Sequence, residues 1–156
     1  MKPIVRAAYR AAWVMRRAYW AAFAPITLGV RAAVFDEAGR ILLVRHTYRP
    51  GWYLPGGGVE RRETIRDALV RELDEEVGVT MAEEPTLFGV YTNFFENKSD
   101  HVALFRVGRY AIRPRPNLEI AEQGFFAMDA PPADSSPGTL RRLAELQGHA
   151  PIGHMW

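Results

Sequence analysis

The chain of 156 residues contains no cysteine. Disulfide bonds, thiolate metal sites and a cysteine nucleophile are therefore excluded. The absence of cysteine fits a reducing compartment, so we expect a cytoplasmic location. A chain of this length can bury one sizeable hydrophobic core without covalent cross-links.

Acidic residues are absent from the first 35 positions. These positions hold six of the 20 basic residues and carry a charge of +6, whereas the remainder holds 14 basic and 18 acidic residues and carries −4. The acidic remainder would repel nucleic acid, so no DNA partner is expected. The basic arm would instead attract phosphate groups or an anionic surface.

Long apolar runs are also lacking, and the N-terminal arm is too short and interrupted to span a bilayer. Residues 1–24 predict a basic amphipathic helix that Pro25 ends. Its basic stripe consists of Lys2, Arg6, Arg10 and Arg17. Two interpretations stay open: docking onto the domain or a second subunit, as in a homodimer, and peripheral contact with an anionic membrane. An arginine-rich targeting segment has a similar composition.

Residues 25–156 predict a separate folded domain. Strands are predicted over residues 28–35, 40–45, 86–96, 101–110 and 123–128, and helices over residues 64–77 and 138–147. Thr64 has the character of an N-cap, and Gly78 that of a left-handed C-terminal stop. This order of elements predicts an α/β fold in which helices cover a mixed β-sheet.

The helix predicted over residues 64–77 concentrates acidic residues. At about 100° per residue, three glutamates fall within an arc of about 100°, on the side that also holds apolar residues. The glutamates are Glu72, Glu75 and Glu76, and the apolar residues are Ile65, Ala68 and Leu69. Such crowded carboxylates take up protons, bind cationic side chains or bind metal. Taken alone, however, the charge run favours an ordinary solvated face, as expected for Asp74 on the outer side.

The residues before the helix favour metal binding. Gly57 is followed by five residues, Glu63, seven residues and then Arg-Glu-Leu-Asp-Glu-Glu-Val-Gly-Val at positions 71–79. This pattern resembles the Nudix box, Gly-x5-Glu-x7-Arg-Glu-U-x-Glu-Glu-x-Gly-U with U a bulky aliphatic residue, at every specified position. The resemblance implies a Nudix-type α/β/α sandwich around a mixed β-sheet, to which the N-terminal helix would be an addition.

The resemblance also implies an activity. Nudix hydrolases cleave a pyrophosphate bond in a nucleoside diphosphate linked to another group X, or in a nucleoside triphosphate, by water attack at phosphorus with Mg²⁺ or Mn²⁺. The metal ions neutralise the phosphates and lower the pKa of bound water. The alternative is a Nudix-like regulatory domain that senses a nucleotide without turnover. Phe94 and Phe95 stand where subfamily markers are expected, so the sequence supports neither an ADP-ribose nor a dinucleoside polyphosphate hydrolase.

By position, the resemblance assigns the site residues. The metal ligands would be the Gly56 carbonyl, Glu60, Glu72, Glu75 and Glu76. Glu63 would support the site, and Arg71 would orient the box carboxylates. The general base stays open between Glu72 and a glutamate of a later loop, Glu119 or Glu122.

The segment before the box mixes cations with aromatic rings. Arg45 is the predicted phosphate contact, because a guanidinium suits phosphate. Glycine and proline forbid regular structure over residues 54–58, which we call the glycine loop. Trp52 and Tyr53 either anchor this loop in the core or stack on a nucleobase. Gly57 is expected beside the substrate, and His46 is expected to form a hydrogen bond at a strand end.

Overall fold

The computed structural model describes residue 15 and residues 25–95, 98–113 and 118–156. The helix predicted over residues 1–24 lies outside the described residues, except for Met15, which is helical and 69% exposed. The division into an N-terminal helix and a domain from residue 25 therefore stays a prediction.

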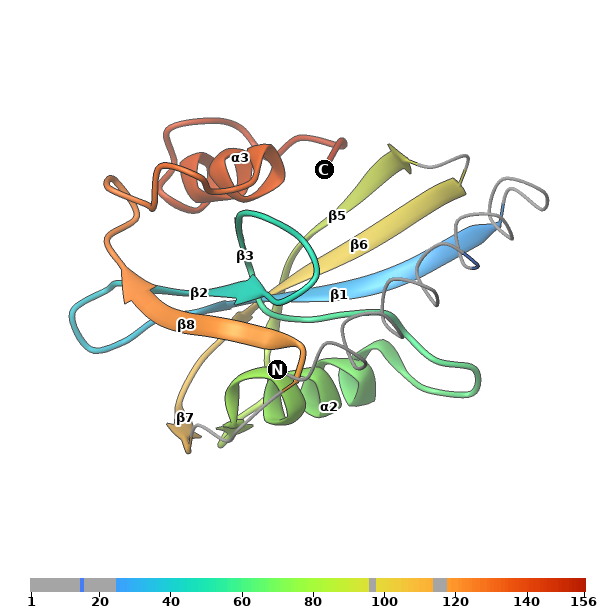
Figure 1. Ribbon diagram of the computed structural model, residues 1–156, viewed down its shortest axis with the longest axis horizontal. Coiled ribbons are helices and arrows are strands. Elements are labelled where there is room, and N and C mark those ends of the chain that lie inside the picture. The colour runs from blue at the N-terminus through green and yellow to red at the C-terminus, as the bar shows by residue number, and fades with distance from the viewer. Residues whose placement is uncertain (1–14, 16–24, 96–97, 114–117) are drawn as a thin grey trace.

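The described domain is a three-layer sandwich. Its elements are β1 (Ile26–Val34), β2 (Ile41–His46), β3 (Trp52–Tyr53), α2 (Ile65–Val77), β4 (Val79–Met81), β5 (Thr86–Phe95), β6 (Lys98–Val107), β7 (Tyr110–Ile112), β8 (Ile120–Phe126) and α3 (Pro137–Leu146). Figure 1 shows the strands between α2, which lies below them, and α3, which lies above. The predicted α/β/α architecture is confirmed.

The strand layer is mixed, as predicted. Its three sheets have the strand orders β1-β6-β5, β3-β2-β8 and β4-β7. β1 runs parallel to β6, from the pair Ile26–Ser99 to the pair Val34–Val107, and the other described strand pairs are antiparallel. The short strands β3, β4 and β7 were not predicted, because two or three residues carry no periodicity of their own. The strand predicted over residues 101–110 corresponds to β6, which begins three residues earlier, at Lys98, and ends at Val107.

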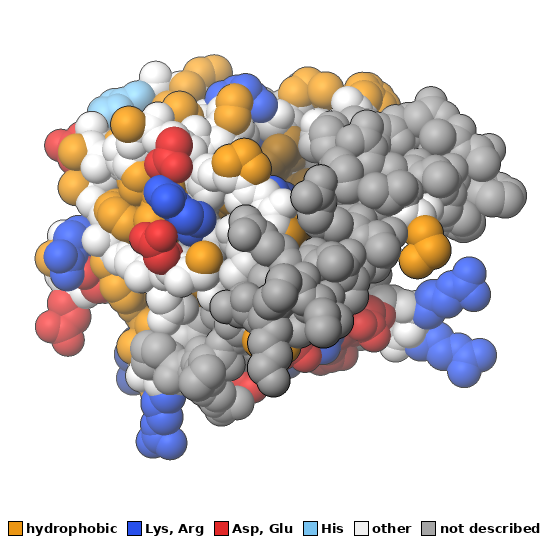
Figure 2. Space-filling model, in the orientation of Figure 1, with side chains coloured by type: hydrophobic (Ala, Val, Ile, Leu, Met, Phe, Trp, Pro, Cys, Tyr) orange, Lys and Arg blue, Asp and Glu red, His pale blue; other side chains and the backbone are white. Residues whose placement is uncertain are grey.

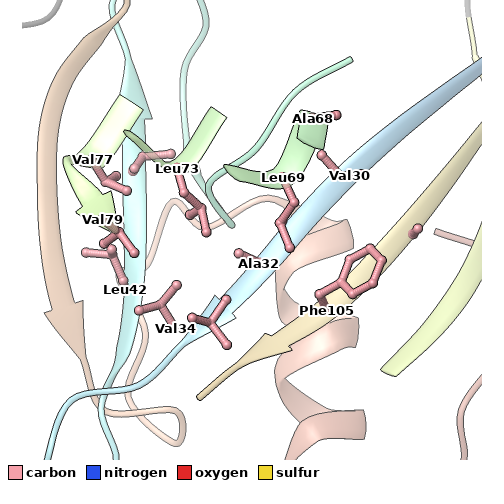
Figure 3. Packing of buried hydrophobic residues seen from close by; sticks show 13 residues of the cluster. Val30, Ala32, Val34, Leu42, Ala68, Leu69, Leu73, Val77, Val79 and Phe105 are labelled. Carbon is pink, nitrogen blue, oxygen red and sulfur yellow. The ribbon is translucent and has the colours of Figure 1, made fainter. Parts of the chain in front are cut away.

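One hydrophobic core joins α2 to β1 and β6 (Figure 3). The inward residues of α2 are Ala68, Leu69, Leu73 and Val77, which meet Val30, Ala32 and Val34 of β1 and Phe105 of β6. Alternation along β1 places its three residues on one face. The prediction that Ile65 shares the inward face is wrong: it is 38% exposed, because it opens the helix before the turns that pack on the sheet.

A second core lies under α3, on the opposite face of the strands. Leu143 of α3 packs there with Leu104 of β6 and with Tyr91 of β5. The Tyr91 hydroxyl donates to Glu145 at 2.8 Å, and Glu145 also accepts from Arg142 at 2.7 Å. These buried polar groups pair with one another, which reduces the cost of burying their charges.

Both predicted ends of α2 are confirmed. The Thr64 hydroxyl accepts from the Asp67 N–H at 3.1 Å, which satisfies one of the orphan donors at the start of the helix. Gly78 ends the helix with φ of 67°, a left-handed conformation that glycine adopts without a steric penalty. The N-cap fixes where α2 begins relative to the loop before it.

On the face in Figure 2, described acidic and basic side chains are interspersed rather than separated by sign. Among the described residues, no helix is both long and apolar enough to cross a membrane.

We expect Leu73→Ala to lower the free energy of unfolding by about 2–5 kcal/mol, because Leu73 is fully buried between α2 and β1. Val70→Ala in the same helix is the control, since Val70 is 38% exposed, and it should cost less than about 1 kcal/mol. Urea unfolding followed by circular dichroism measures both. Equal losses for the two variants would contradict the packing of α2 described above.

Candidate active site

The glycine loop is hydrogen-bonded along one edge of β1. The Val30 N–H donates to the Gly57 carbonyl and the Ala32 N–H to the Pro55 carbonyl, each at 2.9 Å. Gly56 between them has φ of 129°, and a Cβ there would stand 2.3 Å from the Val30 carbonyl oxygen. Only glycine can therefore bring the loop backbone this close to the strand.

Glu76 lies on the inner side of α2, against this loop. Its side chain is 7% exposed, and its Oε2 accepts from the Gly56 N–H at 2.8 Å. Burial raises the pKa of Glu76 to about 7, although Arg31 and the Gly56 hydrogen bond oppose the shift. Burial thus disfavours the charged form of Glu76 more than the nearby cations favour it.

Glu72 lies one helical turn earlier and meets the next glycine of the loop. A Cβ on Gly57 would stand 2.3 Å from Glu72 Oε1, so the carboxylate fills the space that glycine leaves. Burial raises the pKa of Glu72, against the lowering effect of Arg71 and Arg31. Gly56 and Gly57 thus each receive one carboxylate of the helix.

Arg71 draws the remaining box carboxylates together. Its guanidinium donates to both oxygens of Glu63 at 2.8 and 2.9 Å, to Glu72 at 2.8 Å and to Glu75 at 3.4 Å. It also donates to the Gly58 carbonyl at 3.0 Å. The hydrogen bonds from Arg71 lower the pKa of Glu63 to about 2, and those to Glu63 raise the pKa of Arg71.

Three other predicted site residues, Glu63, Glu60 and Glu75, lie outside the buried pair of Glu72 and Glu76. Glu63 directly precedes Thr64, the N-cap of α2, and its carboxylate accepts from the Glu60 N–H at 2.8 Å. Glu60 itself is exposed. Glu75, predicted on the inward face, has a side chain 59% exposed, because it lies at the edge of the face that Leu73 and Val77 centre on β1.

Within the described residues, no group of three Asp, Glu or His side chains is arranged to hold a metal ion. The ion pairs of Arg71 with Glu72 and Glu75 explain this, because they turn these two carboxylates toward a guanidinium. The donors still suit a hard cation, because Glu76 is buried against Gly56, Glu72 is partly buried against Gly57, and both supply carboxylate oxygens. The residues present therefore fit a divalent cation that would replace cationic side chains at these oxygens.

Arg45, the predicted phosphate contact, forms ion pairs with acidic side chains in this structure. Its guanidinium pairs with Asp134 at 3.0 Å and with Glu122 at 3.7 Å, and it lies 4.9 Å over the Trp52 ring. Trp52 is 5% exposed and packs in the core under α3, which supports its interpretation as an anchor of the loop. The Tyr53 hydroxyl donates to a backbone carbonyl of the same loop, that of Pro50.

A buried cationic group beside Glu76 was not predicted. Arg49 donates to His46 at 2.8 Å and lies 3.7 Å over the Tyr53 ring. Burial, aided by Arg49, lowers the pKa of His46 to about 3, so this imidazole is neutral although its Nδ1 lies 3.9 Å from Glu76. The predicted hydrogen bond of His46 at a strand end is present. Only the mixture of cations and rings in residues 45–53 could have signalled this group.

Of the two later glutamates, Glu119 directly precedes β8 and Glu122 lies within it, so the prediction that Glu122 lies on a loop is wrong. Pairing of β2 with β8 sets Glu122 opposite Arg45. The Thr47 N–H donates to the Glu119 carbonyl at 2.7 Å. Burial raises the pKa of Tyr48, and the negative charges of Glu119 and Glu76 contribute to the shift.

An α/β/α sandwich in which a glycine loop and an acidic helix meet is the Nudix-type fold. The family profile described as NUDIX domain matches residues 25–144. The chain therefore belongs to the NUDIX family.

Solved structures share this fold. The MutT NUDIX hydrolase from Burkholderia pseudomallei is similar over 78% of this chain and 98% of that one, with 26% identity and a TM-score of 0.69. A structure titled UDP-X diphosphatase is similar over 92% of this chain and 72% of that one, with 25% identity and a TM-score of 0.61.

Curated relatives match shorter segments. The Nudix hydrolase YvcI of Bacillus subtilis is 36% identical over 73 residues, which cover 47% of this chain and 45% of that protein. The RNA pyrophosphohydrolase of Pseudomonas paraeruginosa is 48% identical over 44 residues, 28% of each. The chain thus spans less than half the length of these two relatives.

The raised pKa of Glu76 predicts how the metal-free protein responds to pH. Between the ordinary value of 4.5 and about 7, the folded state holds a proton that the unfolded state has released. Stability should therefore fall as the pH rises through this range, by on the order of 3 kcal/mol at most, and Glu76→Gln should remove this loss. Urea unfolding with a chelator at pH 5, 6, 7 and 8 measures the difference between the two proteins.

His46 acts in the opposite sense, because its lowered pKa makes stability rise with pH between about 3 and 6.5. This contribution is present in wild type and in Glu76→Gln, so the difference between them isolates Glu76. Parallel stability curves for the two proteins would contradict the buried, protonated state described for Glu76.

Proposed function

We propose that this protein is a metal-dependent Nudix hydrolase that cleaves a pyrophosphate bond in a nucleoside diphosphate linked to a group X, or in a nucleoside triphosphate. The observation that carries the proposal is the pair of buried carboxylates, Glu72 and Glu76, held against Gly57 and Gly56. Burial of two neighbouring acids without full neutralisation lowers the stability of the fold. Such destabilising groups are typical of functional sites.

Mg²⁺ or Mn²⁺ is the proposed cofactor. The Gly56 carbonyl, Glu72 and Glu76 would hold the cation, with Glu75 and Glu60 joining from the exposed rim. A bound cation would neutralise the charge of the pyrophosphate that repels an attacking oxygen. Oxygen donors of this kind suit Mg²⁺, which commonly connects protein carboxylates to substrate phosphates.

The chain's own residues would position the reactants. Arg71 fixes Glu63 and orients Glu72 through the hydrogen bonds described above, so its role is to position carboxylates rather than to bind phosphate. Glu72, Glu119 or Glu122 would accept the proton of the attacking water. Arg45, if released from its acidic partners, would bind phosphate, and Tyr53 would lie beside the base.

The names of similar proteins support a general substrate class but no particular substrate. Relatives and structural neighbours carry the names RNA pyrophosphohydrolase, MutT and UDP-X diphosphatase. These names share hydrolysis at a nucleotide pyrophosphate and differ in the group attached to it. A panel of substrates therefore tests the proposal better than any single compound.

With Mg²⁺, the protein should release phosphate or pyrophosphate from at least one of three probes: a UDP-sugar, a nucleoside triphosphate or a 5′-triphosphorylated RNA oligonucleotide. Glu72→Gln and Glu76→Gln should lower the rate by roughly 100-fold or more, because each removes a carboxylate ligand. Asp74→Asn, on the outer side of the same helix, is the control and should retain activity. Nucleotide binding without hydrolysis of any probe would favour the nucleotide-sensing alternative.

Gly57→Ala should abolish most of this activity while leaving the fold intact. The three atoms nearest to the new Cβ all belong to the carboxylate of Glu72, a flexible side-chain end that can move away at little cost in stability. Displacement of a reacting group by about 1 Å costs on the order of 100-fold in rate. Gly58→Ala is the matched control, since a Cβ there meets nothing within 4 Å. Equal activity of the two alanine variants would argue against a role for the position of Glu72.

A further inference from the structure

Arg31 of β1 reaches the centre of the site from the strand side. Its guanidinium donates to the Gly56 carbonyl and, at 3.2 Å, to the Val30 carbonyl. A Cβ on Gly56 would stand 3.1 Å from the Arg31 Cα, so the glycine loop and the strand touch at this point. The side chain of Arg31 therefore runs along the loop toward the oxygen proposed as a metal ligand.

The two ends of one peptide segment thus receive opposite charges. The Gly56 N–H donates to Glu76, whereas the Gly56 carbonyl accepts from Arg31. Burial raises the pKa of Glu76 and of Glu72, and Arg31 acts in the lowering direction on both. The guanidinium is thus within electrostatic reach of both buried carboxylates.

Arg31 and Arg71 use their donors differently. Arg71 is bound to three carboxylates and a carbonyl, which leave it little capacity for another anion. Arg31 is bound to two carbonyls, and in the described part of the chain no Asp or Glu forms an ion pair with it. A guanidinium with five N–H donors and neutral partners retains the capacity to bind an anion bidentately.

We propose that Arg31 acts as an internal cation at the metal site, is displaced from the Gly56 carbonyl by the divalent cation, and then binds a phosphate oxygen of the substrate. The displacement follows from charge, because two cations at one carbonyl oxygen repel strongly in a partly buried site. The displaced guanidinium is left beside the bound pyrophosphate, whose oxygens match the planar fork of its N–H donors. This inference rests on the proposed function, and it makes Arg31 a substrate-binding residue that couples metal binding to substrate binding.

The first test is titration calorimetry with Mn²⁺ alone, without nucleotide. Arg31→Met removes the competing cation and should bind Mn²⁺ roughly tenfold more tightly than wild type. Arg40→Met is the matched control, because Arg40 is 54% exposed and pairs with Asp36 in the turn after β1. Its Mn²⁺ affinity should equal that of wild type.

The second test uses inorganic pyrophosphate in the presence of saturating Mn²⁺. Arg31→Met should bind pyrophosphate roughly tenfold more weakly than wild type, because the charged donor is lost. If Arg31 had a purely structural role, Arg31→Met would bind both Mn²⁺ and pyrophosphate more weakly. The proposal requires opposite changes, tighter metal and weaker pyrophosphate.

Should Arg31→Met fail to fold, Arg31→Gln is the second variant, since its amide can still donate to the Gly56 carbonyl without a charge. It should show the same two opposite changes. Unchanged or weaker Mn²⁺ binding by a folded, uncharged variant overturns the displacement of Arg31, even if wild type is active. Absence of Mn²⁺ binding by wild type and by every variant would overturn the proposed function together with this inference.

Discussion

The Gly56 peptide segment is the point on which the site depends. It contacts the β1 backbone so closely that a side chain cannot fit, and its N–H and carbonyl are bound by Glu76 and Arg31. The apolar face of α2 packs on β1 and thereby fixes the position of the helix relative to the strand. The same strand thus supports the helix and the loop, which fixes the distance between a carboxylate and a carbonyl from separate elements.

Charge is balanced unevenly across the acidic helix. Arg71 neutralises the outer carboxylates, so the pKa of Glu63 is low, whereas burial keeps the pKa of Glu76 high. Three neighbouring acids are tolerated because Arg71 pairs with Glu72 and Glu75, Glu75 is also exposed, and the raised pKa of Glu76, about 7, lets it take up a proton. Burial of charge thus lowers stability at the end of α2 that meets the glycine loop, and the proposed divalent cation would reduce this loss.

Much of this arrangement was predictable from local sequence. The caps of α2, its length and the meeting of glycine loop with acidic helix all depend on residues close together in the chain. The roles inferred for Ile65 and Glu75 were less accurate, because a helical wheel gives direction but not the edge of the contact with the sheet. Short β3, β4 and β7 escaped prediction, since their pairing partners lie elsewhere in the chain.

The sequence by itself determined the family, the order of the main elements and the box that supplies the acids, because each is encoded by spacing within a short segment. Only the tertiary structure decided which cations stand against those acids. Arg31 comes from β1 and Arg49 from the loop after β2, and pairing between β1 and the glycine loop brings Arg31 to Gly56. A charged side chain carries no signal of its distant partner, so its role became visible only when the strands were placed.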